Sequence, residues 1–131
     1  MPQQQSWTPV KLPSPMPAPA GAYSPAVRAG DLVFVSGQVP KDLATGEMIG
    51  GDVRVQTRQT MRNLEIALLA AGASLTDLVS VTVYLQDAGD WGAFDETYRE
   101  IMRAPFPTRA AVGAELRGIL VEISGVAYRP A

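Results

Sequence analysis

Residues 79–86, Val-Ser-Val-Thr-Val-Tyr-Leu-Gln, alternate apolar and polar side chains more regularly than any other segment of the chain. A period of two is typical of a β-strand with one buried face, because successive side chains of a strand point to opposite sides. Helical spacing precedes this segment at residues 53–71 and follows it at residues 91–102. A strand between two helices indicates a domain of the α+β class.

Both helical segments have an apolar stripe and are flanked by residues typical of helix ends. Asp52 is positioned to cap the first helix, Gly72 to end it, and Asp90 to cap the second. The buried stripe of the first helix, at three- and four-residue spacings, consists of Met61, Leu64, Leu68 and Ala71. The stripe of the second helix, which we interpret as core rather than a cofactor-binding surface, consists of Trp91, Phe94, Tyr98, Ile101 and Met102.

Further strands flank the two helices. Residues 26–28 and 32–36 surround Ala29-Gly30-Asp31, a pattern typical of a hairpin turn. Residues 109–113 and 119–128 read as two strands around a turn near Arg117-Gly118. The predicted order is β-β-α-β-α-β-β, with both helices on one face of a mixed sheet. Because the other face would be bare, we expect another subunit to cover it.

The first twenty residues differ in composition from the remainder. Pro13, Pro15, Pro17 and Pro19 alternate with small residues, which favours an extended path without regular pairing. We predict a proline-rich arm at residues 1–20 and one domain at residues 21–131. The arm is expected to lie on the body of the domain; the alternative is a polyproline ligand for a partner domain.

The composition narrows the possible chemistry. The chain has no cysteine and no histidine, which excludes thiolate nucleophiles, imidazole bases and metal sites built from these ligands. A net charge of −2 and the lack of a basic cluster speak against nucleic-acid binding. The apolar stretches are too short to cross a membrane, and no secretory signal is visible at the N-terminus. We therefore expect a cytoplasmic protein.

Two charged residues lie within strand patterns, where an unpaired charge is costly. Arg109 opens a strand of small apolar residues, and Glu122 lies between Val121 and Ile123. The pattern by itself favours a structural ion pair between strands, or a solvated sheet face, over a catalytic pair. Ser36-Gly37 ends another strand, and glycine there would allow a ligand to approach the backbone closely.

Three segments then resemble successive signatures of the Rid family of imine and enamine deaminases. They lie at residues 30–40, 56–64 and 106–112, and the resemblance extends from about residue 21 to residue 127. It implies a chorismate-mutase-like subunit assembled as a homotrimer with clefts between subunits. It also implies hydrolysis of small 2-imino or enamino acids to 2-oxo acids and ammonia, without a metal or organic cofactor.

The resemblance implies roles for individual residues. Arg109 would hold the substrate carboxylate, and Glu122 would orient the attacking water. Asp95 stands where the best-known members carry asparagine, and Ser124 replaces a second glutamate, which leaves the substrate open. The residues expected to line the cleft are Tyr23, Ser36, Gly37, Asp95 and Ala111.

Two other functions stay open from the sequence. One is endoribonuclease or translation-inhibitor activity, which the acidic charge balance disfavours. The other is a non-catalytic trimer that binds small carboxylates or protein partners.

Overall fold

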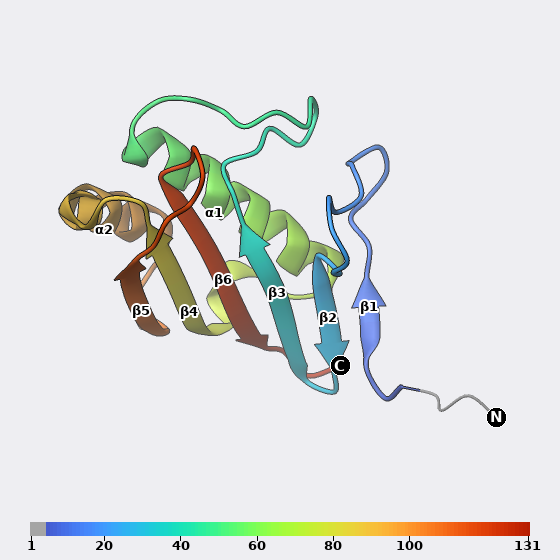
Figure 1. Cartoon of the computed structure of the whole chain (residues 1–131). Helices are drawn as coiled ribbons and strands as arrows, with labels where there is room; N and C mark the ends of the chain where they lie inside the picture. Colours follow the sequence, from blue (N-terminus) through green and yellow to red (C-terminus); the bar gives the residue numbers. More distant parts are fainter. Residues whose placement is uncertain (1–4) are drawn as a thin grey trace.

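The alternating segment forms β4 (Leu78–Leu85), which runs parallel to β5 (Thr108–Gly113) and antiparallel to β6 (Val121–Tyr128). The computed structural model describes residues 5–131. Its single sheet has the strand order β1-β2-β3-β6-β4-β5 (Figure 1). The hairpin predicted near residue 30 is formed by β2 (Ala26–Ala29) and β3 (Leu32–Gln38).

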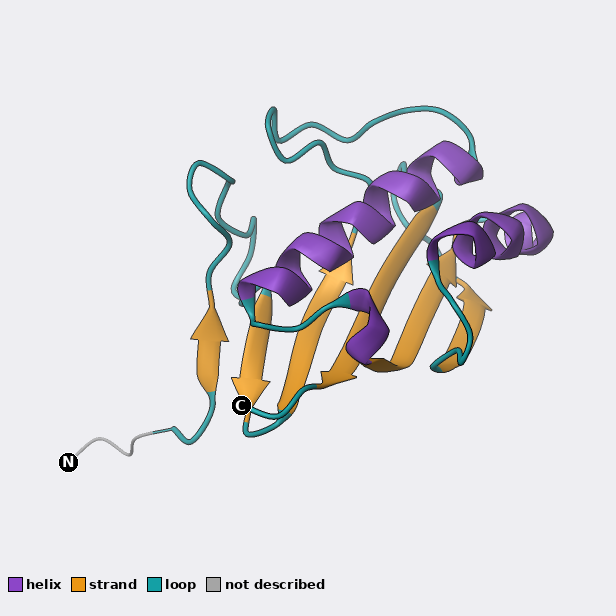
Figure 2. Ribbon diagram, turned by 180° about the vertical axis from the view of Figure 1, so that it is seen from behind, coloured by secondary structure: helices purple, strands orange, loops and turns teal. Residues whose placement is uncertain are grey.

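Two helices cover one face of this sheet, α1 (Val53–Ala70) and α2 (Trp91–Ile101) (Figure 2). Short 3₁₀ turns precede β4 and α2, at Leu75–Asp77 and Ala88–Asp90. The core lies between the helices and the sheet, and its largest fully buried side chains include Phe94, Met61, Leu64, Leu68, Leu85 and Ile123. The predicted α+β fold, with a mixed sheet and two helices on one face, is confirmed.

The helix ends follow the predicted signals in α1 and depart from them in α2. The Asp52 side chain accepts a hydrogen bond of 3.0 Å from the Val55 N–H, and Gly72 follows α1 with a φ of +83°. Asp90 occupies the N-cap position of α2, but its side chain makes no capping hydrogen bond. The side chain of Asp87, three residues earlier, instead accepts a hydrogen bond of 2.8 Å from the Gly89 N–H. It therefore stabilises the 3₁₀ turn that leads into α2.

The N-terminal arm contributes a strand that the sequence did not predict. Residues Thr8–Val10 form β1, which pairs antiparallel with β2, with Thr8 opposite Arg28. The prediction missed β1 because prolines surround it and it is only three residues long. A proline within an edge strand is tolerated, since one side of that strand has no partner to pair with. Residues 1–4 of the predicted arm lie outside the described residues.

Buried polar side chains of α1 hold the loop at residues 39–52 through hydrogen bonds to its backbone. Asn63 is 2% exposed, and its Nδ2 donates to the carbonyls of Val39 (2.9 Å) and Lys41 (2.8 Å). Its Oδ1 accepts from Gln59 Nε2 at 2.9 Å. Buried amides are stable here because their hydrogen bonds replace those lost from water.

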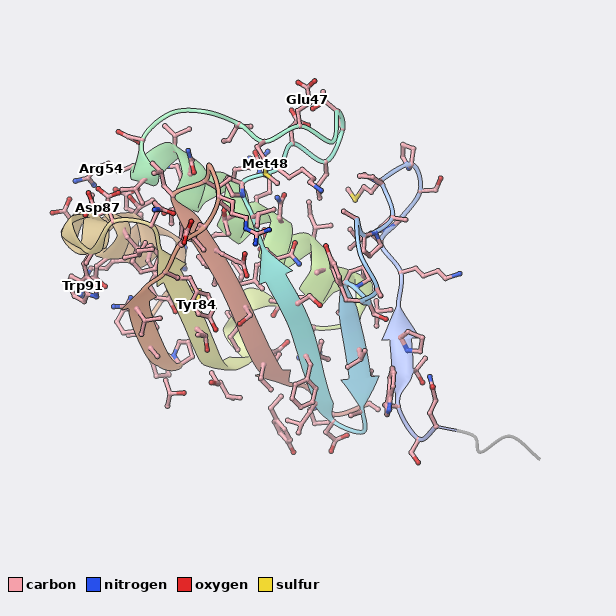
Figure 3. All side chains as sticks on the ribbon, viewed as in Figure 1. Glu47, Met48, Arg54, Tyr84, Asp87 and Trp91 are labelled. Atoms are coloured by element: carbon pink, nitrogen blue, oxygen red, sulfur yellow. The ribbon has the colours of Figure 1, made fainter. Side chains whose placement is uncertain are left out.

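The second face of the sheet carries no helix. Tyr84 lies on this face, over β4 (Figure 3). Several large apolar side chains on the same face are exposed, among them Leu32, Phe34, Val112 and Tyr128. None of the helices in residues 5–131 is both long and apolar enough to cross a membrane.

Replacing Asn63 by alanine should destabilise the fold, because two loop carbonyls would lose their buried donor. We expect a loss of about 1–3 kcal/mol in the free energy of unfolding, measured by urea denaturation. The matched control is Arg62→Ala, at the adjacent exposed position of the same helix, which should change stability by less than about 0.5 kcal/mol. Equal effects of the two substitutions would contradict the role assigned to Asn63.

Candidate active site

Arg109 projects from β5 toward the helices. Its register partner on β4 is Val81, a core residue 1% exposed, so both side chains point to the helix-covered side of the sheet. The guanidinium Nη1 lies 2.9 Å from Oδ1 of Asp95 on α2. Because the Arg109 side chain is only 18% exposed and that of Asp95 17%, each largely buried charge is compensated by the other.

Three aromatic rings of α2 surround the guanidinium. Its central carbon lies 4.9 Å from the ring centroid of Tyr98, 5.4 Å from that of Phe94 and 5.5 Å from that of Trp91. Cations are attracted to the faces of such rings. Phe94 and Tyr98 are buried as predicted, whereas Trp91 is 47% exposed at the start of α2. The prediction that Trp91 is core is therefore wrong: it packs beside Arg109 near the molecular surface.

Asp95 contacts two arginines. Its Oδ2 lies 3.3 Å from Nη2 of Arg99, one helical turn further along α2. Burial raises the pKa of the Asp95 carboxyl, but the hydrogen bonds and positive charges of Arg109 and Arg99 outweigh burial. The pKa of Asp95 therefore lies below its ordinary value, and the group is ionised at neutral pH.

A pocket of ≈ 280 Å³ opens beside these groups. The Arg99 guanidinium lies 5.7 Å from the centroid of the Phe106 ring. The Tyr98 hydroxyl is buried and has no hydrogen-bond partner among the described residues, and burial raises its pKa. The lining consists of Asp95, Tyr98, Arg99, Phe106, Pro107 and Arg109.

Glu122 lies on the opposite face of the sheet from Arg109. It pairs in register with Tyr84, and its neighbours Val121 and Ile123 are buried on the helix side. Its carboxylate covers Gly37: a Cβ added to Gly37 would lie 3.0 Å from the Glu122 carboxyl carbon. The pairing of β3 with β6 shifts register between Val35 and Gln38, so the strands bulge at this point. Glycine at position 37 leaves room for the carboxylate.

Tyr23 and Ser36 lie near Glu122 rather than near Arg109. The Ser36 Oγ donates to the Ser24 carbonyl at 2.6 Å, and the Ser36 N–H donates to the Pro25 carbonyl at 3.0 Å. Tyr23 is 54% exposed and shares a small hollow of ≈ 60 Å³ with Gly37. Part of the arm closes that hollow, through Leu12, Pro17, Ala18 and Pro19.

The predicted site residues thus form two groups within one chain. Arg109 and Asp95 meet on the helix-covered face, with Ala111 two residues further along the same side of β5. Glu122 and Gly37 meet on the open face. Two strand spacings across the sheet and three residues along β5 separate Glu122 from Arg109, roughly 10 Å in each direction.

Sequence reasoning missed Arg99 and Phe106 as neighbours of this pocket. The four-residue spacing of Asp95 and Arg99 on a helix was a usable signal, because such residues face each other. Among residues 5–131, no three acidic side chains gather closely enough to suggest a metal site.

Comparison with known proteins identifies the family. A family model described as Endoribonuclease L-PSP matches residues 14–129. The chain is 43% identical over 115 residues to a RutC family protein of Pyrococcus horikoshii, covering 86% of this chain and 91% of that protein. It is 38% identical over 118 residues to the 2-iminobutanoate/2-iminopropanoate deaminase of Rattus norvegicus, covering 88% and 86%.

A solved structure agrees with this assignment. The crystal structure of E. coli TdcF with bound serine superimposes with a TM-score of 0.82 at 31% identity, covering 91% of this chain and 98% of that one. The chain therefore belongs to the Endoribonuclease L-PSP family. This is the Rid family that the sequence resembles, so the expected family is confirmed.

Asp95→Asn should lower stability in a pH-dependent way. A carboxyl whose pKa is lower in the folded chain stabilises the fold above its unfolded pKa, and this contribution is lost as the pH falls through the folded pKa. We expect the variant to be about 1–3 kcal/mol less stable near pH 7, because Arg109 loses a charged partner. The difference from the parent chain should shrink below about pH 4.

Urea unfolding of both proteins across this pH range measures the effect. Glu100→Gln is the control, since it removes an exposed carboxylate of the same helix that pairs with Arg58 at 3.4 Å. That control should change stability little at any pH. A difference between Asp95→Asn and the parent chain that persists unchanged in acid would refute the assignment.

Proposed function

We propose that this chain is a hydrolytic deaminase that converts reactive 2-imino and enamino acids into 2-oxo acids and ammonia. The observation that carries the proposal is the Arg109 guanidinium, fixed by Asp95 and three aromatic rings at the wall of a small pocket. A rigidly held guanidinium is suited to a carboxylate, which it can bind through two parallel hydrogen bonds.

Arg109 retains donors for such a ligand. A guanidinium has five N–H donors, and the 2.9 Å contact with Asp95 is made through Nη1. The relatives support a small carboxylate as the substrate class. The rat relative is named for 2-iminobutanoate and 2-iminopropanoate, and the solved TdcF structure contains serine, another small carboxylate.

The second part of the proposed site is Glu122, with Gly37 beneath its carboxylate and Tyr23 and Ser36 nearby. Within the described residues no arginine or lysine forms a salt bridge with Glu122, so no cation of the same chain competes for its carboxylate. Ala111 would line the cleft from the same strand as Arg109. Because Arg109 and Glu122 are on opposite faces of one sheet, the complete site requires Glu122 of a neighbouring copy.

Assembly of three copies would supply that neighbour. The open face of the sheet exposes Phe34, Val112 and Tyr128, which water solvates poorly. Burying these side chains against other copies would stabilise a homotrimer and bring the two halves of the site together in clefts between subunits. The site would then be incomplete in a monomer.

The chemistry follows from this arrangement. A protonated imine is already electrophilic at carbon, so the site has to hold its carboxylate and place one water. Glu122 accepts a proton as the water oxygen bonds to that carbon, and the proton then passes to the nitrogen. As the carbon–nitrogen bond breaks and ammonia leaves, the remaining hydroxyl proton passes to the Glu122 carboxylate and the carbonyl forms. A positioned acid–base group of this kind contributes about 10²–10⁴-fold to the rate.

The proposal does not extend to RNA cleavage, although the description of the family model names an endoribonuclease. The net charge is −2, and Arg54 and Arg58 on α1 are paired with glutamates of α2 at 2.7 and 3.4 Å. RNA binding depends on unpaired cations that replace the counterions of phosphate groups.

Substitutions of Arg109 and Glu122 test the assignment. Arg109→Ala should lower kcat/KM for 2-iminopropanoate generated in situ by roughly 10²–10³-fold, because the carboxylate loses its anchor. Arg109→Lys should retain an intermediate activity, since it keeps the charge but not the planar fork. Glu122→Gln should lower kcat by about 10²–10⁴-fold and leave the binding of the product, 2-oxobutanoate or pyruvate, nearly unchanged.

Ammonia release measures these activities, and Arg103→Ala is the control. Arg103 is exposed and does not line the Arg109 pocket, so its removal should leave turnover unchanged. If folded Arg109→Ala and Glu122→Gln proteins hydrolyse the imine as fast as the parent chain, the proposal is wrong.

The assembly has its own test. Phe34→Asp should reduce the particle from three times the subunit mass of 13.9 kDa toward the subunit mass itself, as measured by sedimentation. Val55→Asp is the matched control, because Val55 is 44% exposed on α1, away from the open face, and Phe34 is 42% exposed. A monomeric parent protein that hydrolyses imines efficiently would rule out a shared site.

A further inference from the structure

The pocket beside Arg109 contains a second guanidinium, that of Arg99, whose position does not follow from the needs of the fold. The Arg99 side chain is 67% exposed, so it contributes little to the core. Its guanidinium nevertheless has two partners in the pocket wall, the Asp95 carboxylate at 3.3 Å and the Phe106 ring at 5.7 Å. These contacts hold an exposed side chain at the pocket.

Asp95 connects the two arginines through different oxygens. Oδ1 contacts Nη1 of Arg109, and Oδ2 contacts Nη2 of Arg99. The carboxylate therefore bridges the cations and separates them, which reduces the repulsion between two positive charges at one pocket. The two contacts are made by a terminal nitrogen of each arginine, and a guanidinium has five N–H donors in all, so donors are left for a ligand.

The charged residues of the pocket lining determine the net charge that a ligand meets. Arg99 and Arg109 are positive, Asp95 is negative, and the other lining residues are uncharged, so one positive charge is left over. Without Arg99, Asp95 would neutralise Arg109 and the wall would carry no net charge. With Arg99 present, a single carboxylate brings the wall to neutrality, whereas two carboxylates would leave it negative.

We propose that Arg99 is a specificity-determining residue that offsets the charge of Asp95 and so fits the Arg109 pocket to substrates with one carboxylate. This inference rests on the proposed function, in which Arg109 binds the carboxylate of the substrate. Asp95 positions Arg109, but its negative charge cancels the positive charge of Arg109. Arg99 adds a second positive charge, so the pocket wall keeps a net charge of +1. The protonated nitrogen of an imino acid would lie on the Glu122 side of the cleft.

Removing the charges of Arg99 and Asp95, singly and together, in the full-length, assembled protein tests the inference. The probes are 2-oxobutanoate, with one carboxylate, and 2-oxoglutarate, with two, and calorimetry gives their dissociation constants at low ionic strength. Arg99→Gln should weaken 2-oxobutanoate binding by about two- to fivefold, the range of one partly solvated charge. The Asp95→Asn/Arg99→Gln double variant should bind 2-oxobutanoate more tightly than Arg99→Gln, because Arg109 again supplies one net charge, but it should not regain the parent value, because Arg109 has lost the carboxylate that positions it.

Asp95→Asn by itself leaves two positive charges in the wall. It should therefore shift the preference between the two probes toward 2-oxoglutarate by about two- to fivefold. The matched control is Arg58→Gln, which removes an arginine of the same charge from an exposed ion pair outside the pocket. That control should leave both dissociation constants unchanged, and added salt should diminish the Arg99 effect but not abolish binding.

The outcomes separate this inference from the function on which it rests. Equal effects of Arg99→Gln and Arg58→Gln, or a double variant that binds as weakly as Arg99→Gln, would overturn the role of Arg99 while imine hydrolysis stands. Carboxylate binding with the predicted charge dependence but without imine turnover would refute the deaminase and keep the role of Arg99. A folded parent protein that binds neither probe would overturn both.

Discussion

A guanidinium held among core side chains is the constraint around which one end of this molecule is organised. Arg109 points to the same side of the sheet as the buried Val81, so its charge needs compensation within the protein. Asp95 supplies a carboxylate at 2.9 Å, and the rings of α2 supply their negative faces. The same contacts attach α2 to β5, so packing and the proposed carboxylate binding depend on one residue.

Most of the fold follows from local patterns in the sequence. Alternation identifies β4, apolar spacing identifies α1 and α2, and Asp52 and Gly72 mark the ends of α1. These signals are readable because each reflects contacts close together in the chain. The three-residue β1 was not predictable, since its stability comes from pairing with β2 about twenty residues away. Thr8 and Val10 favour a strand, but two such residues around a proline are too short a pattern to predict one.

The candidate site was predictable in its residues but not in its geometry. Charges at positions 109 and 122 stand out because they interrupt apolar strand patterns. Their placement on opposite faces depends on strand order and register, which no local pattern contains. Trp91 was misassigned to the core for a related reason. Helical periodicity identifies the inner face of α2, but not how far the sheet extends beneath its first turn.

The shape of β1 has a consequence for how copies of this protein can meet. Sheet edges can recruit foreign strands through their free backbone groups, and this leads to aggregation. Here the outermost strand has three residues and a central proline, Pro9, which has no N–H to donate. This edge of the sheet therefore offers an incoming strand a short and interrupted template. On this side of the molecule the proposed contacts between copies are therefore left to the open face of the sheet, where shape complementarity rather than backbone pairing would select the partner.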